Sequence, residues 1–211
     1  MQINNRNQQE EFWAGTFGTE YISRNNSAEL LASNLHFFSK ALRGIAPIKS
    51  CIEFGANVGM NLLALQNLFP KLDLSAIEIN FVAAGELKKM IGEEKVMNCS
   101  ISEAQFDSNY DLALIKGVLI HINPDQLTEI YNQLYKASSR YILIAEYYNP
   151  SPVTISYRGH SERLFKRDFA GEFLDNFKDT RLIDYGFAYK RDPLFPQDDI
   201  TWFLIEKDSH K

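Results

Sequence analysis

The chain has 211 residues, of which 45% are hydrophobic and 23% are charged, and its net charge is -5. This length and composition suit a single folded domain with a full hydrophobic core. The acidic balance argues against a protein that binds nucleic acid by neutralising phosphates. No apolar run reaches the roughly 18 residues of a membrane span, and no basic segment followed by an apolar one opens the chain, so we expect a cytoplasmic protein without membrane contact.

An aromatic block lies near the N-terminus, between Phe12 and Tyr21. Exposing so many large apolar side chains is costly, so we expect this block to dock on the rest of the protein, whereas the polar residues 1–9 should be frayed. A second helix is predicted from about Ser27 to Leu42, with Ser27 as its N-cap. Its apolar face comprises Leu30, Leu31, Leu35 and Phe38.

The stretch from Ser50 to Leu63 predicts a buried strand, a glycine loop and a helix. Gly55 and Gly59 permit a main chain that a ligand can approach closely, and the helix that follows presents free N–H groups. Glu53 precedes the first glycine, so the pattern differs from the dinucleotide fingerprint Gly-x-Gly-x-x-Gly. A carboxylate there repels a pyrophosphate but suits a ligand with an ammonium group, a sulfonium and a ribose. S-adenosylmethionine (SAM) is such a ligand; the alternative is an ordinary strand-to-helix turn.

Two resemblances follow from these residues. The run Glu53-Phe54-Gly55-Ala56-Asn57-Val58-Gly59 resembles motif I of the Rossmann-like, class I SAM-dependent methyltransferases, with Asn57 where many members have glycine. Together with Phe12-Trp13-x-Gly15-x-Phe17-Gly18-x-x-Tyr21-x-x-Arg24-Asn25, it looks like the methylases associated with pseudaminic acid biosynthesis. That resemblance implies a methyltransferase acting on a nonulosonic, pseudaminic-acid-like sugar or its precursor.

The next predicted strand, 72–79, ends in a candidate ribose site. The Glu78 carboxylate can accept both hydroxyls of a ribose, and Ile79 beside it would lie against the adenine. The alternative for Glu78 is a solvated charge at a strand end.

A helix over 81–91 and a short third strand over 94–99 follow. Related methyltransferases often place an acid after this strand to bind the amino group of adenine, but the segment Asn98 to Ile101 contains none. We therefore assign this contact to Ser100 or to the backbone around Ile101.

The fourth strand, 110–116, ends at Lys116 and Gly117, where the main chain can pass close to the methionine part of SAM. His121 follows, before a predicted helix over 125–137. Because the free pKa of histidine lies near neutrality, His121 is our candidate for a general base or for a group that orients the acceptor. The alternative is a packed histidine bonded to the backbone.

The segment after the fifth strand, 141–146, is the predicted acceptor pocket. Its candidate residues are Tyr147, Tyr157, Arg158 and His160. Arg158 and His160 would match an anionic sugar, and the alternative is a solvated loop whose charges pair locally. A helix is predicted over 165–177.

The last two strands, 182–187 and 200–205, have no helix between them and predict an antiparallel hairpin at the sheet edge. The expected fold is α/β: a Rossmann-like methyltransferase with a mostly parallel seven-stranded sheet and an N-terminal helical extension. We divide the single domain, 1–211, into a helical cap, 1–46, and a core, 47–211. The scattered cysteines and histidines predict no metal site.

The predicted activity is transfer of a methyl group from SAM to an oxygen or nitrogen of a small polar acceptor, with S-adenosylhomocysteine (SAH) as product. Arg24 could reach the methionine carboxylate if the cap folds over the cofactor. The alternatives are another small-molecule acceptor, such as an amino acid or a secondary metabolite, and a non-catalytic SAM-binding protein. The oligomeric state is left open.

Overall fold

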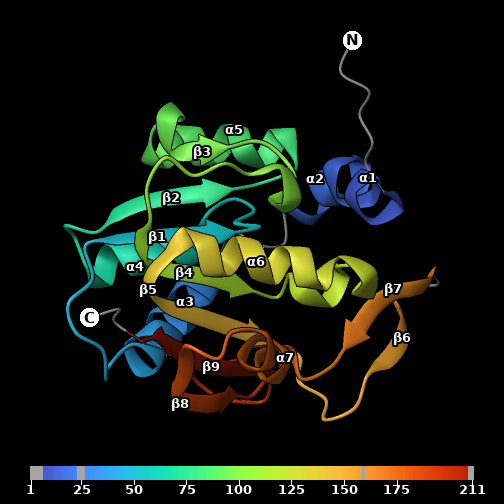
Figure 1. The fold of residues 1–211 in the computed structure, drawn as a ribbon. Coiled ribbons are helices and arrows are strands. Elements are labelled where there is room, and N and C mark those ends of the chain that lie inside the picture. The colour runs from blue at the N-terminus through green and yellow to red at the C-terminus, as the bar shows by residue number, and fades with distance from the viewer. Residues whose placement is uncertain (1–6, 23–26, 158–159, 209–211) are drawn as a thin grey trace.

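The protein is described by a computed structural model that covers residues 7–22, 27–157 and 160–208. A seven-stranded sheet forms its centre, in the order β3-β2-β1-β4-β5-β9-β8 (Figure 1). The strands are β1 (Ser50–Phe54), β2 (Asp73–Ile77), β3 (Val96–Met97), β4 (Tyr110–Lys116), β5 (Ser138–Glu146), β8 (Thr180–Ala188) and β9 (Ile200–Lys207). The first five pair in parallel, and β9 is antiparallel to both β5 and β8. The predicted fold class is confirmed.

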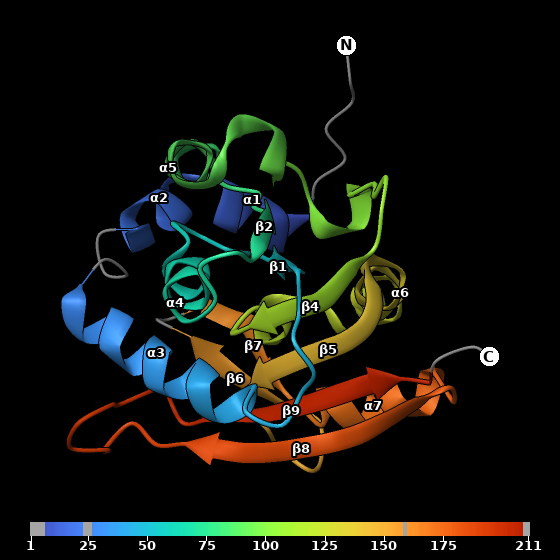
Figure 2. The same cartoon turned by 90° about the vertical axis from the view of Figure 1, so that its left-hand side faces the viewer.

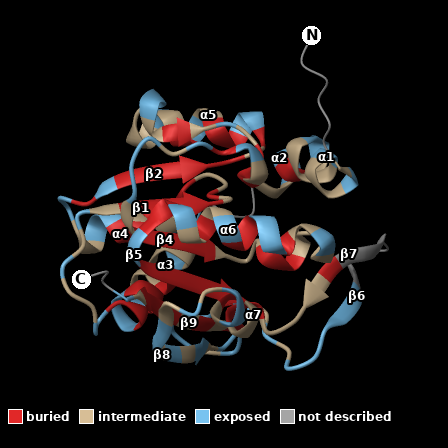
Figure 3. Ribbon diagram, in the orientation of Figure 1, coloured by how far each residue is buried: buried red, intermediate tan, exposed pale blue. Residues whose placement is uncertain are grey.

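Helices cover both faces of the sheet (Figure 2). One face carries α3 (Ala28–Ala41), α4 (Met60–Leu68) and α5 (Phe81–Ile91), and the other carries α6 (Leu127–Ala137) and α7 (Phe169–Asn176). The central strands alternate between the two cores: Leu112 and Leu114 of β4 face the first, whereas Ala113 and Ile115 face the second. This burial on both faces explains why these strands are almost continuously apolar (Figure 3).

The aromatic block forms two short helices, α1 (Gln8–Ala14) and α2 (Thr16–Ile22), which dock at the carboxyl ends of the parallel strands (Figure 1). Asn7 caps α1, and its backbone N–H donates to the Glu10 carboxylate, which closes a capping box. The prediction that residues 1–9 are frayed is therefore wrong for Asn7 to Gln9. Docking leaves Phe12, Trp13, Phe17 and Tyr21 partly buried, so the prediction that this block docks is confirmed but none of its rings is fully buried.

Three other details differ from the sequence predictions. Helix α3 has Ser27 as its N-cap, as predicted, but it buries Ser33 and Asn34, while Leu30, Leu31 and Leu35 stay partly exposed. The predicted loop after β5 forms a hairpin of β6 (Val153–Tyr157) and β7 (His160–Lys166). Helix α7 then begins at Phe169 and not at 165, because the Asp168 side chain caps it by accepting from the Gly171 N–H.

Short 3-10 helices complete the described chain: η1 (Glu93–Lys95), η2 (Ile101–Glu103), η3 (Leu119–His121) and η4 (Pro124–Gln126). The predicted third strand is shorter than expected because its first residues belong to η1. Among the described helices, none has the length and apolar character needed to cross a membrane.

Candidate active site

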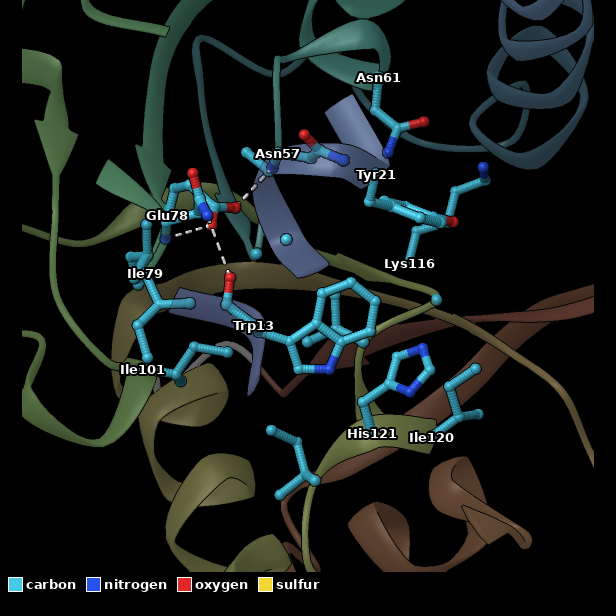
Figure 4. Close-up of a pocket in the computed structure, with 18 of the residues that line it drawn as sticks. Trp13, Tyr21, Asn57, Asn61, Glu78, Ile79, Ile101, Lys116, Ile120 and His121 are labelled. Carbon is cyan, nitrogen blue, oxygen red and sulfur yellow. Dashed lines mark hydrogen bonds between the residues drawn. The ribbon is translucent and has the colours of Figure 1, made fainter. Parts of the chain in front are cut away.

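A cavity of about 580 Å³ opens at the carboxyl ends of β1, β2 and β4, where parallel α/β sheets bind ligands (Figure 4). The cap contributes Glu10, Trp13 and Tyr21 to its wall. The end of β4 and the segments that follow the parallel strands contribute residues that the sequence had placed there: Gly55, Ala56, Asn57, Glu78, Ile79, Ser100, Ile101, Lys116, Gly117, His121 and Tyr147.

The other predicted site residues either do not line the cavity or lie outside what the structure describes. Glu53 and Gly59 do not line the cavity. Arg24 and Arg158 lie outside the described residues, and the side chains of Tyr157 and His160 are also outside what the structure describes.

The loop between β1 and α4 has a left-handed main chain at Gly55, Asn57 and Gly59, with φ of +73°, +49° and +82°. A Cβ on Gly55 would lie 2.7 Å from a methyl carbon of Val118, so only glycine fits without a shift. Gly59 opens α4 without any side-chain cap, which leaves N–H groups at the start of the helix. The loop therefore brings the main chain itself to the cavity.

Glu78 lies at the end of β2 with only 7% of its surface exposed. Its carboxylate accepts one hydrogen bond from the Asn57 N–H and one from the Asn80 N–H, each of 2.7 Å (Figure 4). Burial raises the pKa of Glu78, and these hydrogen bonds oppose the rise. A carboxylate has about four lone-pair positions, so the free ones can serve a ligand in the cavity.

Glu53, which the sequence assigned to the ligand, does not line the cavity. It lies on the same side of β1 as Cys51 and is fully buried beneath α4, where it accepts a hydrogen bond of 2.6 Å from the Asn61 side chain. Burial raises the pKa of Glu53 to about 8, against the opposing effects of the Asn61 hydrogen bond and the Lys116 charge. Asn61 and Lys116 line the cavity instead.

Three asparagine side chains on the wall each keep one buried polar atom with no hydrogen-bond partner among the described residues: Asn34 Nδ2, Asn57 Oδ1 and Asn61 Oδ1. The Asn34 carbonyl oxygen accepts from Lys116 at 3.4 Å and from Gln197 at 3.0 Å. Unpaired buried polar atoms are costly, so this group, which we call the amide cluster, indicates a polar ligand. Asn34 was not predicted from the sequence. The signal that could have identified it is an asparagine on the otherwise apolar face of the predicted helix.

His121 ends η3 at the other side of the cavity. Its ring lies against the Trp13 indole, with 4.6 Å between the ring centroids (Figure 4). The Glu146 carboxylate accepts from the Val118 and Leu119 N–H groups, both at 2.8 Å, and so holds the start of η3. The wall here is mostly apolar, with Ile120, Ile122, Ile130 and Leu164.

Asn80 joins the cap to the sheet. Its side-chain oxygen caps α5 by accepting from the Val82 and Ala83 N–H groups, and its amide nitrogen lies 3.2 Å from the Trp13 carbonyl oxygen. Neither this link nor the contact of Trp13 with His121 was predicted, because both depend on how distant segments meet.

Comparison with solved structures identifies the fold. The chain superposes on Burkholderia thailandensis 1,6-didemethyltoxoflavin-N1-methyltransferase, solved with its substrate and SAH, with a TM-score of 0.71 and 14% identity over 95% of this chain and 87% of that one. The chain has the class I methyltransferase fold. Magnesium protoporphyrin IX methyltransferase from Synechocystis, solved with SAM, has a TM-score of 0.69 and 12% identity over 97% and 100% of the two chains.

A SAM-dependent methyltransferase from Leishmania major shares the class I fold as well, with a TM-score of 0.70 and 14% identity over 94% of this chain and 81% of that one. No family model matches the chain, and no curated protein matches it in sequence. The structural neighbours thus support the class I fold and not the finer resemblance to the pseudaminic acid methylases.

Proposed function

We propose that this protein is a SAM-dependent methyltransferase that methylates an oxygen or nitrogen of a small molecule. The observation that carries the proposal is the amide cluster, which combines one free donor and two free acceptors beside Lys116. The methionine end of SAM carries a carboxylate and an ammonium group, which require those partners. The neighbours that contain SAM or SAH support the same cofactor.

The residues present fit SAM along the whole cavity. Asn34 Nδ2 and Lys116 would donate to the carboxylate, and the Asn57 and Asn61 oxygens would accept from the ammonium group. Glu78 would accept the ribose hydroxyls through its free lone pairs. Bound SAM supplies a methyl group already activated by the sulfonium charge.

The protein's own contribution is to position the acceptor, to exclude water and to accept a proton. Trp13, on the cap, lines the cavity beside His121 and would help to exclude water once the ligands are bound. His121 would accept the proton that the acceptor oxygen or nitrogen loses. Glu146 would keep His121 in place, because it anchors the N–H groups that begin η3.

The acceptor is a small molecule in this proposal, and the nonulosonic sugar remains a prediction. The cations proposed for such a sugar, Arg158 and His160, have no described side chains. The largely apolar wall around His121 equally admits a secondary metabolite. An acceptor screen with isotopically labelled SAM separates these classes, and the absence of any acceptor would favour a non-catalytic SAM-binding protein.

We further propose that residues 1–211 act as one domain in which 1–46 form a cap. The contacts of Trp13 with His121 and Asn80 support a cap that closes directly on the site.

Calorimetric titration with SAH tests the cofactor assignment. The protein should bind one SAH per chain, and Glu78→Ala should weaken binding by about 1–3 kcal/mol, the usual loss when buried partners are left unpaired. Asn34→Ala should weaken SAH but leave adenosine unaffected, because adenosine lacks the methionine end. Glu86→Ala, an exposed carboxylate on α5, is the matched control. Failure of the unaltered protein to bind either SAM or SAH would overturn the proposal.

A further inference from the structure

We propose that Glu10, on cap helix α1, binds the exocyclic amino group of the cofactor's adenine, so that the cap itself recognises the base. This inference rests on the proposed SAM site. The segment after β3 contains no acid at this position, and the structure brings one from a distant part of the chain: the Ser100 hydroxyl donates to the Glu10 carboxylate.

Both partners belong to the cavity wall. Glu10, Ser100 and Ser102 line it, and the two serine hydroxyl oxygens lie 3.0 Å apart. Glu10 also accepts from the Asn7 N–H at 2.9 Å. With two hydrogen bonds accepted, the carboxylate retains lone pairs for a further donor.

The positions of Glu78 and the amide cluster determine which end of the cavity takes the base. Lys116 and the amide cluster take the methionine end, and Glu78 takes the ribose. The remaining side, next to Glu78, is flanked by Ile79 and Ile101, which offer apolar surfaces to a flat ring (Figure 4). Ser100, which directly precedes Ile101, places the Glu10 carboxylate at this end.

An adenine amino group is a hydrogen-bond donor and needs an acceptor. Three described carboxylates line the cavity: Glu10, Glu78 and Asp198. Glu78 serves the ribose, and Asp198 interacts electrostatically with Lys116 at the methionine end. Glu103 bonds the Ser100 N–H but does not line the cavity. Glu10 is therefore the carboxylate placed for the amino group.

Helix α1 is held at both ends, so Glu10 is preorganised. At its start, the Asn7 side chain donates to the Gln126 side-chain oxygen at 2.7 Å. At its end, the Asn80 side-chain nitrogen lies 3.2 Å from the Trp13 carbonyl oxygen and 3.3 Å from that of Gly15. Preorganisation reduces the entropy lost on binding, which favours recognition of the base by this side chain.

The test compares SAH with S-inosylhomocysteine, in which a carbonyl oxygen replaces the amino group. By calorimetry the unaltered protein should prefer SAH. Glu10→Gln should weaken SAH by about tenfold and leave S-inosylhomocysteine unchanged or tighter, because glutamine can donate to the carbonyl. Glutamine also serves in a capping box, so the helix should persist. Glu11→Gln, at an exposed neighbour on the same helix, should change neither affinity.

The outcomes distinguish this inference from the proposed function. If the unaltered protein binds SAH but Glu10→Gln keeps the full preference, or weakens both ligands equally, the assignment of Glu10 is overturned and the SAM site stands. If the unaltered protein binds neither ligand, the SAM site itself is overturned, and Glu10 with it.

Discussion

At the scale of single residues, the proposed role of His121 as a general base depends on where the fold holds its ring. It lies on the cavity wall against Trp13, at the end of a short helix that Glu146 anchors. This arrangement fixes the position of the imidazole beside a largely apolar wall, where a small acceptor could lie. A base must first lie within reach of the proton that it accepts.

We predict that His121→Gln lowers kcat by roughly 100-fold, because general base catalysis contributes about 10²–10⁴. SAH affinity should stay the same, since His121 is not assigned to the cofactor. The rate is measured as SAH release with an acceptor found in the screen. His36→Gln, at a histidine that stacks on Phe195 and does not line the cavity, is the control. An unchanged rate for His121→Gln would show that this ring only packs.

Glu53 makes the free energy of unfolding of the protein depend on pH. Its folded-state pKa is raised from 4.5 to about 8 by burial. Between these values the folded protein retains a proton that the unfolded chain has lost, so the contribution of Glu53 to stability declines as pH rises through this window.

We therefore predict that Glu53→Gln stabilises the protein relative to the unaltered chain by more at pH 8 than at pH 5. The difference should be at least about 1 kcal/mol, since one pKa unit corresponds to 1.36 kcal/mol. Urea unfolding of both proteins at the two pH values measures it. Equal differences at both pH values would mean that Glu53 does not hold a proton in the folded state.

At the scale of elements, helices α1 and α2 of the cap depend on their contacts with the rest of the protein. The two short helices α1 and α2 are too short to be stable alone, so their order depends on docking. Asn80 provides one such contact, because its side chain caps α5 and also reaches the carbonyls at the end of α1.

We predict that Asn80→Asp loosens the cap while leaving α5 intact. Aspartate keeps the acceptor that caps α5, but it loses the amide donor and places a negative charge against the α1 carbonyls. Hydrogen exchange should speed up by about tenfold in residues 7–22 and stay unchanged in 81–91. Asn67→Asp, the same change at an exposed position on α4, is the control. Unchanged exchange in 7–22 would mean that other contacts hold the cap.

At the scale of the whole molecule, the cavity is built from segments far apart in the sequence. The cap, the loop after β1 and the connection between β8 and β9 all reach it, and Gln197 of that connection bonds Asn34 of α3. A ligand that contacts all of these segments stabilises the folded protein as a unit, because it binds only when they are assembled.

We predict that SAH at 100 times its Kd raises the free energy of unfolding by about 2.7 kcal/mol and Tm by about 5–10 °C. ATP at the same concentration should have little effect, because its phosphates would extend toward the methionine end, where the Asn57 and Asn61 oxygens and the Asp198 carboxylate offer acceptors and repel phosphate oxygens. Differential scanning fluorimetry measures both. An equal shift with ATP would indicate a general nucleotide site.

The sequence alone determined the fold class, the glycine loop and the ribose candidate Glu78. These features depend on local patterns: apolar strands, a glycine order that allows a left-handed main chain, and an acid at a strand end. Period-two alternation in β1 also determines which face Glu53 occupies, but sequence reasoning assigned it to the ligand because the position of Asn61 over it was unknown.

Only the tertiary structure decided which distant side chains meet at the site. Glu10 accepts a hydrogen bond from Ser100, Asn34 accepts from both Lys116 and Gln197, and the Trp13 ring contacts that of His121. It also decided that the segment after β5 pairs as a hairpin instead of forming a loop. The physical reason is that these contacts arise from packing between elements far apart in the chain, and local propensity carries no information about which of them become neighbours.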